Sequence, residues 1–395
     1  MHCNNFKGLQ LSALGFGTMR LPVAADGEID KSKTQEMVDA LLLGGCNYFD
    51  LAYPYMDGKS ETVIGECLRG KDRSAFYLAD KYPGHQHFMP LTPEEVFEEQ
   101  LKKVGTDYFD FYLLHNVNDS CYDHYTDEEY GIVRYFEEQK KKGRIRHLGF
   151  SSHASEGCFE RFLSWCEEKG YEMEFCQIEL NYLDWTLQDA AAKVKVLNEK
   201  NIPIWVMEPV RGGKLASFSE KDAAVMEAFE KGKSAASWAL RWASSVPGVV
   251  VTLSGMSNMT QVQDNLATFS SLSPLSGEEE KALFAIAEGM KDDIPCTTCR
   301  YCVKACPQGI NIPLMMRLEN EICFQATFQP GMIVAGLPDG QKPWDCLQCG
   351  ACAVNCPQGI DIPEVLSDLT ARLKAAPDWV EICREREEIR RKSIG

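Results

Sequence analysis

The 395-residue sequence contains no uninterrupted apolar run long enough to cross a membrane, and its first 21 residues show no charged-then-apolar targeting pattern. It also has no excess of basic residues, because its net charge is −17 at pH 7. That charge repels nucleic acid and anionic membranes, so we expect neither as a partner. Hydrophobic residues make up 45% of the chain, which is typical of a folded globular protein.

A further absence concerns the fold. No G-x-G-x-x-G segment follows an early strand, so the dinucleotide-binding fingerprint of doubly wound sheets is missing. Apolar β-like runs instead alternate with amphipathic helical stretches such as 33–43, 94–104, 159–169, 187–200 and 234–243. The eight predicted strands are 14–19, 47–50, 76–79, 109–114, 148–150, 175–180, 204–208 and 249–254. Eight such units over about 250 residues predict a parallel (β/α)8 barrel, and a doubly wound sheet is the alternative.

The chain divides into three parts by composition. Residues 1–270 carry the predicted barrel, and residues 271–291 form a Ser/Gly break followed by an acidic helix, which we interpret as a linker. Residues 292–395 form a second module. Its apolar stretches 312–322 and 363–373 indicate a mainly helical structure.

Cysteine is abundant, and eight of the 17 cysteines lie in two matching C-x2-C-x2-C-x3-C-P motifs in the second module. This spacing is typical of bacterial-type 4Fe-4S clusters, in which the fourth cysteine of one motif commonly binds the other cluster. The motifs therefore predict a ferredoxin-like domain with two crossed ligand sets. The first set is Cys296, Cys299, Cys302 and Cys356, and the second is Cys346, Cys349, Cys352 and Cys306.

Two other uses of these cysteines fit the motifs less well. A structural zinc site is the main alternative, but zinc takes four ligands and does not need a third cysteine at the same spacing followed by Cys-Pro. Disulfides are disfavoured because no secretory signal precedes the motifs. The nine remaining cysteines fit a reducing cytoplasm, and exposed clusters would favour an anaerobic one.

Polar and titratable residues recur where the predicted barrel strands end. A (β/α)8 barrel places its active site at the carboxyl ends of its strands, so these residues predict an active-site rim. They are Asp50, Lys81, His115, Ser151, Ser152, His153, Gln177, Asn181, Glu208, Ser254 and Gly255. Tyr82, His85, His87 and Tyr122 are further candidates for the pocket wall.

Several of these segments resemble those of the aldo-keto reductases over roughly residues 8–270. The matching segments are Asn47-Tyr-Phe-Asp-Leu-Ala-Tyr-Pro-Tyr55, Leu78-Ala-Asp-Lys81, Tyr112-Leu-Leu-His115, His147-Leu-Gly-Phe-Ser-Ser152, Gln177-Ile-Glu-Leu-Asn181 and Met207-Glu-Pro-Val-Arg-Gly-Gly213. The whole chain is similar to the iron–sulfur-bearing branch of that family. The resemblance implies a catalytic tetrad of Asp50, Tyr55, Lys81 and His115.

The same four residues suit carbonyl reduction by hydride, which requires a proton for the developing alkoxide. We expect Tyr55 to be the general acid/base, with Tyr53 as the local competitor. A tyrosine has a pKa of about 10, so we expect Lys81, held by Asp50, to lower the pKa of Tyr55. His115 can hydrogen-bond the substrate oxygen.

By resemblance, Ser151, Ser152 and Gln177 bind a nicotinamide carboxamide. Further implied cofactor contacts are Gly17, Thr18, Met19, Glu208, Pro209, Arg211, Gly213, Ser254, Gly255, Gln261 and Asn265. Gly255 and Gln261 stand where basic residues often bind the 2′-phosphate of NADP. Their neutral side chains favour NAD over NADP, or another phosphate-bearing cofactor such as FMN, although Lys214 or Arg211 could compensate.

Three functions are compatible with these features. The first is an oxidoreductase whose barrel acts on a carbonyl or alcohol, while the clusters pass electrons to or from a partner or a bound flavin or nicotinamide. A flavin would convert a two-electron hydride into single electrons, and the acidic surface would suit docking to a basic redox partner. The second is an NAD(P)H-dependent carbonyl reductase whose cluster domain is structural or redox-sensing. The third is a non-catalytic electron-transfer subunit.

Overall fold

The computed structural model describes residues 1–86, 92–290, 294, 296, 299–325, 327–356, 358–376, 384–385 and 388–389. His87 and Cys383 lie outside the described residues. In the part of the chain that the structure describes, no helix combines the length and apolarity needed to cross a membrane.

Eight parallel strands close into a barrel in the order β10-β3-β4-β5-β6-β7-β8-β9. The predicted (β/α)8 fold is therefore confirmed, and all eight predicted strands are present. They are β3 (Leu14–Gly17), β4 (Tyr48–Asp50), β5 (Tyr77–Tyr82), β6 (Phe109–Val117), β7 (Ile145–Ser152), β8 (Cys176–Glu179), β9 (Ile204–Met207) and β10 (Val249–Ser254). Most of their residues are buried, because each strand is covered on both faces.

A short antiparallel hairpin precedes the barrel, and the sequence did not predict it. It consists of β1 (Cys3–Phe6) and β2 (Leu9–Ser12), which pair over four residues each. Phe6 and Leu11 are buried against the large side chains inside the barrel, among them Phe111 and Trp205. The hairpin therefore packs against the interior of the barrel, which gives its two short strands the apolar contact that they lack alone.

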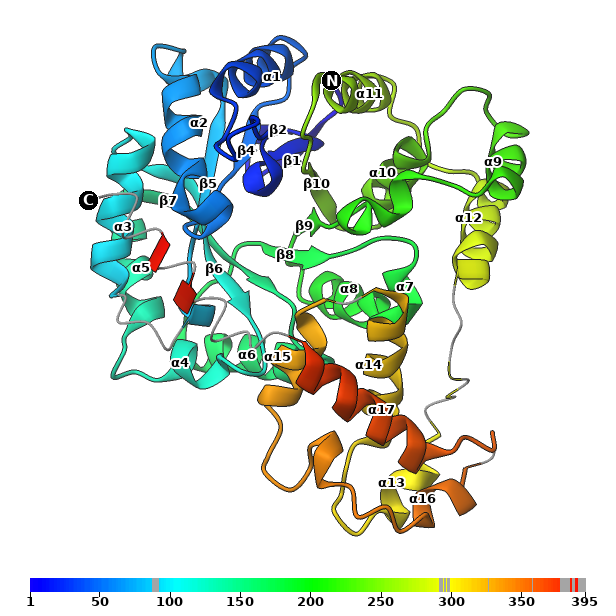
Figure 1. The fold of residues 1–395 in the computed structure, drawn as a ribbon. Helices are drawn as coiled ribbons and strands as arrows, with labels where there is room; N and C mark the ends of the chain where they lie inside the picture. The colour runs from blue at the N-terminus through cyan, green and yellow to red at the C-terminus, as the bar shows by residue number, and fades with distance from the viewer. Residues whose placement is uncertain are drawn as a thin grey trace.

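Helices surround the barrel, as Figure 1 shows. In chain order they are α1 (Lys31–Leu43), α2 (Ser60–Leu68), α3 (Pro93–Val104), α4 (Tyr122–Thr126), α5 (Ile132–Lys141), α6 (Glu156–Lys169), α7 (Asp184–Leu187), α8 (Ala190–Glu199), α9 (Glu220–Glu227), α10 (Ala235–Ser245), α11 (Met259–Ser270) and α12 (Gly277–Met290). Helix α3 begins as the sequence predicts, because the Thr92 side chain accepts a hydrogen bond from the backbone of Glu95 and proline follows at the first turn.

Helix α12, the acidic helix of the predicted linker, packs against the barrel. Leu283, Ile286 and Ala287 belong to the same buried cluster as the barrel helices. The Trp242 indole on α10 donates a hydrogen bond to Glu280 at 3.2 Å. The chain thus stays on the surface of the barrel until the end of α12.

The described part of the second module contains helices and no strand. These are α13 (Tyr301–Ala305), α14 (Ile312–Phe324), α15 (Gln329–Ala335), α16 (Ala351–Val354) and α17 (Ile362–Ala375). Its own core includes Met315, Leu318, Leu366 and Leu369. In Figure 1, α14 and α17 lie side by side, α15 lies next to the barrel, and α13 and α16 lie at the far end of the module. The predicted helical character is confirmed.

Candidate active site

The loop after β4 brings Tyr55 to the carboxyl end of the barrel, at the start of the 3-10 turn Tyr55–Gly58. The rings of Tyr55 and His115 meet edge to face, with their centroids 5.8 Å apart. The neighbouring Tyr53 points elsewhere, because its hydroxyl lies 3.1 Å from the Glu99 carboxylate on α3. Tyr55, and not Tyr53, therefore shares a site with His115.

Lys81 and Asp50 form a buried ion pair behind Tyr55. Nζ of Lys81 lies 2.6 Å from Oδ2 of Asp50 and donates a second hydrogen bond to the backbone oxygen of Leu51, also at 2.6 Å. The two side chains are 0% and 3% exposed. Burial raises the pKa of Asp50 above its ordinary value, and the charge of Lys81 opposes that shift.

The electrostatics of Tyr55 differ from the expectation drawn from the sequence. Burial raises the pKa of Tyr55 well above its usual value, and the negative charges of Asp50 and Glu208 add to the effect. Lys81 lies 5.0 Å from the centre of the Tyr55 ring, but its charge is balanced by Asp50 at 2.6 Å. The expectation that Lys81 lowers the pKa of Tyr55 is therefore not supported. The Tyr55 hydroxyl is therefore protonated at neutral pH and can donate its proton.

His115 is held as a neutral imidazole. Burial lowers its pKa well below the usual value, and the nearby His85 and Lys81 act in the same direction. Its backbone oxygen accepts a hydrogen bond from the Tyr125 hydroxyl at 2.7 Å, which fixes this end of β6. Among the described residues, its buried Nδ1 has no hydrogen-bond partner. A neutral imidazole here can orient a ligand oxygen without adding charge.

Two cavities meet at Tyr55. The larger has a volume of about 610 Å³, and its lining includes Tyr55, His85, His115 and His153. The smaller, of about 260 Å³, runs along the loops after β3, β9 and β10, and we call it the groove. Both are lined by Met19, Arg20, Tyr55, Met207, Glu208 and Gly212. Tyr82 and Tyr122, two of the suggested pocket residues, line neither cavity.

Most predicted cofactor residues line the groove. These are Gly17, Met19, Gln177, Glu208, Pro209, Gly213, Ser254, Gly255, Gln261 and Asn265. Oε1 of Gln177 is buried and has no hydrogen-bond partner among the described residues, so it can accept a bond from a carboxamide. The residues present therefore fit a nicotinamide dinucleotide.

Two residues that were predicted to contact the cofactor have a structural role instead. The Ser152 hydroxyl donates to the Val117 backbone oxygen at 2.8 Å and accepts from the Ala154 backbone at 3.1 Å. The Thr18 hydroxyl donates to the Asp50 backbone oxygen at 2.9 Å and accepts from Ser60. Neither residue lines the groove. Their hydroxyls already bridge neighbouring strands and loops, so the predicted contacts through them are not supported.

Ser151, Arg211 and Lys214 are also displaced from their expected roles. Ser151 and Arg211 line the larger cavity, and Ser151 accepts a hydrogen bond from the Asn116 backbone at 2.8 Å. Arg211 is buried in an ion pair with Asp184 at 2.9 Å. Nζ of Lys214 lies 5.4 Å from the centre of the Phe324 ring. Neither cation lines the groove, so neither replaces the missing basic residues there.

Arg20 is a groove residue that the sequence did not single out. It is the one Lys or Arg among the described residues that line the groove. Its Nη1 lies 3.0 Å from Oε1 of Glu208, and its backbone oxygen accepts a hydrogen bond from Ser257 at 2.7 Å. The cations expected from the sequence, Arg211 and Lys214, follow the seventh barrel strand. Arg20 instead follows the first strand, three residues after β3.

The cysteines of the second module surround two small cavities. Cys296, Cys299, Cys302 and Cys356 line one of them, and Cys306, Cys346, Cys349 and Cys352 line the other. Each set combines three cysteines of one motif with the fourth of the other, which is the crossed arrangement predicted from the sequence. Ile312, at the start of α14, lines both cavities. Four thiolates around an otherwise largely apolar hollow fit a 4Fe-4S cluster.

Comparisons with known proteins agree with both halves of this architecture. The aldo/keto reductase family profile matches residues 13–288, and the 4Fe-4S dicluster domain profile matches residues 295–360. L-galactose dehydrogenase of Arabidopsis thaliana is 26% identical over 313 residues, covering 72% of this chain and 93% of that protein.

Two solved structures show the same barrel fold. The aldo-keto reductase from Klebsiella pneumoniae in complex with NADPH has a TM-score of 0.57 at 22% identity, over 73% of this chain and 96% of that one. Aldo-keto reductase AKR11C1 from Bacillus halodurans has a TM-score of 0.56 at 23% identity, over 71% of this chain and 93% of that one.

Proposed function

The chain belongs to the aldo/keto reductase family, and on that premise we propose that it interconverts a small carbonyl compound and its alcohol at Tyr55. The meeting of the two cavities at Tyr55, with His115 beside it and the Lys81–Asp50 pair behind it, is the observation that carries this proposal. The groove would hold the hydride donor, and the larger cavity would hold the substrate.

The residues of the chain perform the acid–base part of the reaction. Tyr55 is protonated at neutral pH and gives its hydroxyl proton to the carbonyl oxygen as the alcohol forms. Neutral His115 donates a hydrogen bond to the same oxygen and orients it. The Lys81–Asp50 ion pair holds the wall of the site behind Tyr55, with Nζ of Lys81 5.0 Å from the centre of the Tyr55 ring. A bound nicotinamide would supply the hydride that reaches the carbonyl carbon.

We propose NAD as the preferred nicotinamide cofactor. Gly255 and Gln261 line the groove without a positive charge, and the Asp264 carboxylate lines it as well. A 2′-phosphate would meet that carboxylate, and Arg20, the one Lys or Arg lining the groove among the described residues, is already paired with Glu208. The Klebsiella pneumoniae relative was solved with NADPH, so the preference distinguishes this chain from that protein. FMN bound in the groove is the alternative that the sequence also allows.

The two cysteine sets would hold two 4Fe-4S clusters, which exchange single electrons when bound. Helix α14 connects them to the barrel, because its first residue lines both cluster cavities and its last, Phe324, lies under Arg211. Its 13 residues span about 20 Å. We propose that the clusters pass electrons to or from a partner protein or a flavin. We place the start of this cluster module near residue 292.

A second candidate function is an NAD(P)H-dependent carbonyl reductase whose clusters take no part in turnover. It is favoured by the position of α15, since Gln329 and Met332 line the larger cavity. The cluster module thereby forms part of the cavity wall, which is a structural role that needs no electron transfer.

Anaerobic purification followed by an absorbance spectrum and cofactor identification tests these proposals. Carbonyl reduction by NADH supports the barrel chemistry, and cluster bleaching by NADH or by the alcohol supports electron coupling. Turnover with clusters that neither reductant bleaches would favour the second candidate. Intact protein that reduces no carbonyl compound would reject both.

A further inference from the structure

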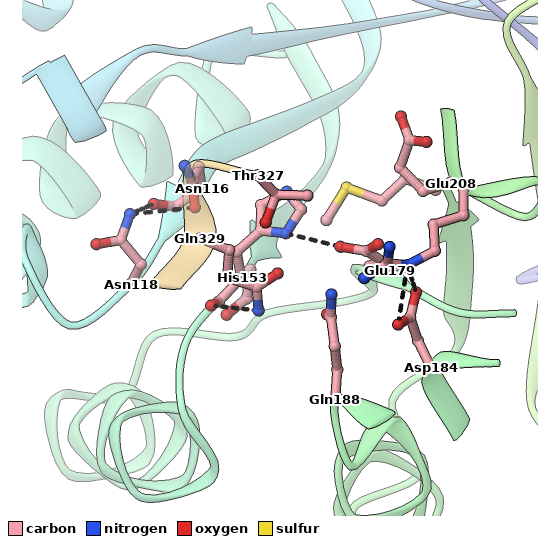
Figure 2. Close-up of polar contacts among 12 residues, drawn as sticks. Asn116, Asn118, His153, Glu179, Asp184, Gln188, Glu208, Thr327 and Gln329 are labelled. Atoms are coloured by element: carbon pink, nitrogen blue, oxygen red, sulfur yellow. Dashed lines mark hydrogen bonds and ion pairs between the residues drawn. The ribbon is translucent and has the colours of Figure 1, made fainter. Parts of the chain in front are cut away.

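The larger cavity is built by both halves of the molecule. The barrel contributes Tyr55, His115 and His153, and the cluster module contributes Gln325 together with Thr327, Phe328, Gln329 and Met332. We call these five module residues the module wall. Figure 2 shows Thr327 and Gln329 beside His153 and Glu179 of the barrel. The side of the cavity away from the barrel is thus formed by the module that carries the cysteines.

Direct hydrogen bonds attach the module wall to the barrel. The Gln329 amide donates to the backbone oxygen of His153 at 3.1 Å, and the Arg211 guanidinium donates to Gln325 at 3.1 Å. The Asn116 amide lies 3.4 Å from the Met332 sulfur. Hydrogen bonds that are at least partly buried, like these, help to fix the relative position of the groups that they join. The module wall is therefore a fixed part of the cavity.

Thr327 is fixed from behind by a buried carboxyl group. Its hydroxyl donates to Oε1 of Glu321 at 3.0 Å, and the Gln188 amide of the barrel donates to the same oxygen at 3.1 Å. Because the hydroxyl proton of Thr327 is directed at Glu321, its oxygen lone pairs can accept a hydrogen bond from a ligand in the cavity.

The charges around the cavity disfavour an anionic substrate. Three Lys or Arg residues line it in the described part of the chain, and each is paired with a carboxylate. The pairs are Arg20–Glu208 at 3.0 Å, Lys59–Glu28 at 2.7 Å and Arg211–Asp184 at 2.9 Å. The carboxylates of Asp57 and Glu179 line the cavity as well. A carboxylate or phosphate on the substrate would find no unpaired cation there.

Uncharged hydrogen-bonding groups lie on several sides of the same cavity. Gln86 contributes an amide from the loop after β5, and its side chain makes no hydrogen bond within the described residues. Gln329 uses only its amide nitrogen there, so its Oε1 can accept a further bond. Such directed donors and acceptors match hydroxyl groups of a ligand.

We propose that the cluster module completes the substrate site, with Gln329 and Thr327 binding the hydroxyl groups of a neutral, hydroxylated carbonyl compound. The carbonyl oxygen of that compound lies against Tyr55 and His115, which line the same cavity. This inference rests on the proposed function and deepens it. It makes the module wall a determinant of specificity, whether or not the clusters exchange electrons during turnover.

The first test compares glyceraldehyde with propanal, which differ in hydroxyl groups. In Gln329→Ala, we expect kcat/KM for glyceraldehyde to fall about 10-fold, mainly through KM, and that for propanal to fall less than about 3-fold. Gln35→Ala on α1 is the matched control, because among the described residues the Gln35 side chain hydrogen-bonds to Asp39 and the Cys67 backbone, and it does not line the cavity. Equal losses for both aldehydes, or no loss, would overturn the proposal.

The second test does not depend on turnover. Xylitol carries hydroxyl groups but no carbonyl, so saturation-transfer NMR measures its binding alone. We expect a signal with the wild type and with Gln35→Ala, and a weaker one with both Gln329→Ala and Thr327→Val. Unchanged cluster absorbance shows that each variant is folded. No wild-type signal, or equal signals in all variants, would overturn the composite site. Xylitol binding without any carbonyl turnover would instead reject the proposed function alone.

Discussion

The Nη1 atom of Arg20 lies 3.0 Å from Oε1 of Glu208, so an ion pair joins the loop after β3 to the loop after β9. Both residues line the groove and the larger cavity. Glu208 also accepts a hydrogen bond from the Gly212 backbone. Because Arg20 is the one Lys or Arg lining the groove among the described residues, a phosphate-bearing cofactor must compete with Glu208 for it.

The Arg20–Glu208 ion pair predicts that substitutions of its two members change the affinity for the cofactor in opposite directions. Arg20→Ala should weaken NADH binding about 10-fold, because a charge-assisted bond to phosphate is lost. Glu208→Gln should strengthen binding, since Arg20 is then released to the cofactor. Fluorescence titration of NADH at low and high salt measures both, and Arg20→Lys should retain part of the affinity. An unchanged dissociation constant in Arg20→Ala would show that Arg20 does not contact the cofactor.

Tyr55→Phe should lower carbonyl reduction by about 10²- to 10⁴-fold, because the proton donor is removed. NADH binding and cluster absorbance should be retained. Tyr53→Phe is the matched control, since the Tyr53 hydroxyl contacts Glu99 and does not line either cavity. Steady-state kinetics distinguish the two variants. Comparable turnover in Tyr55→Phe and the wild type would contradict the assignment of Tyr55 as the proton donor.

Glu321 should make stability pH-dependent. Burial raises its pKa from 4.5 to about 7. A raised folded-state pKa contributes stability that is fully present below pH 4.5 and is lost as the pH rises through about 7. Glu321→Gln keeps an oxygen acceptor for Gln188 and Thr327 but cannot ionise. The stability of the wild type relative to Glu321→Gln should therefore fall between these pH values, by up to about 3 kcal/mol. Parallel denaturation curves of the two proteins at pH 5, 6, 7 and 8 would contradict this.

The crossed ligand sets predict which cluster each cysteine affects. Cys356→Ser should perturb the cluster held by Cys296, Cys299 and Cys302, although it belongs to the other motif. Iron content should fall from about eight to about four per chain if that cluster is lost. Cys323→Ser is the control, because Cys323 lies in the same module and lines neither cluster cavity. Iron analysis and electron paramagnetic resonance provide the readouts. A perturbed second cluster with an intact first one would reverse the pairing.

Much of the fold follows from local sequence. The segments that form β3 to β10 could be recognised as strands because barrel strands are covered on both faces and are therefore rich in apolar residues. The start of α3 could be recognised from its capping residues, Thr92-Pro93. The hairpin of β1 and β2 was missed because each strand has four residues and is stabilised by contact with the barrel interior. Strand boundaries such as the extension of β6 to Val117 depend on pairing with β7.

The residues of the candidate site also differ in how well the sequence alone could place them. Asp50, Lys81 and His115 could be placed because the carboxyl ends of barrel strands converge. The predicted contact through Ser152 is not supported because its hydroxyl is engaged with the backbone of Val117 and Ala154, and such tertiary contacts leave no local sequence pattern. The sign of the Tyr55 pKa shift was wrong because it depends on burial and on how closely Asp50 balances Lys81.

The barrel, the helical cluster module and the crossed cysteine sets could be predicted from sequence alone, since these features depend on short-range spacing and on repeats. The Arg20–Glu208 ion pair, and the presence of Gln329 and Thr327 in the same cavity as Tyr55, depend instead on tertiary packing. Arg20 and Glu208 are 188 positions apart, and Gln329 is 176 positions from His153, whose backbone oxygen it contacts. Such distances in sequence leave no local pattern, because the packing of the two modules, and not the chain between them, sets which side chains meet.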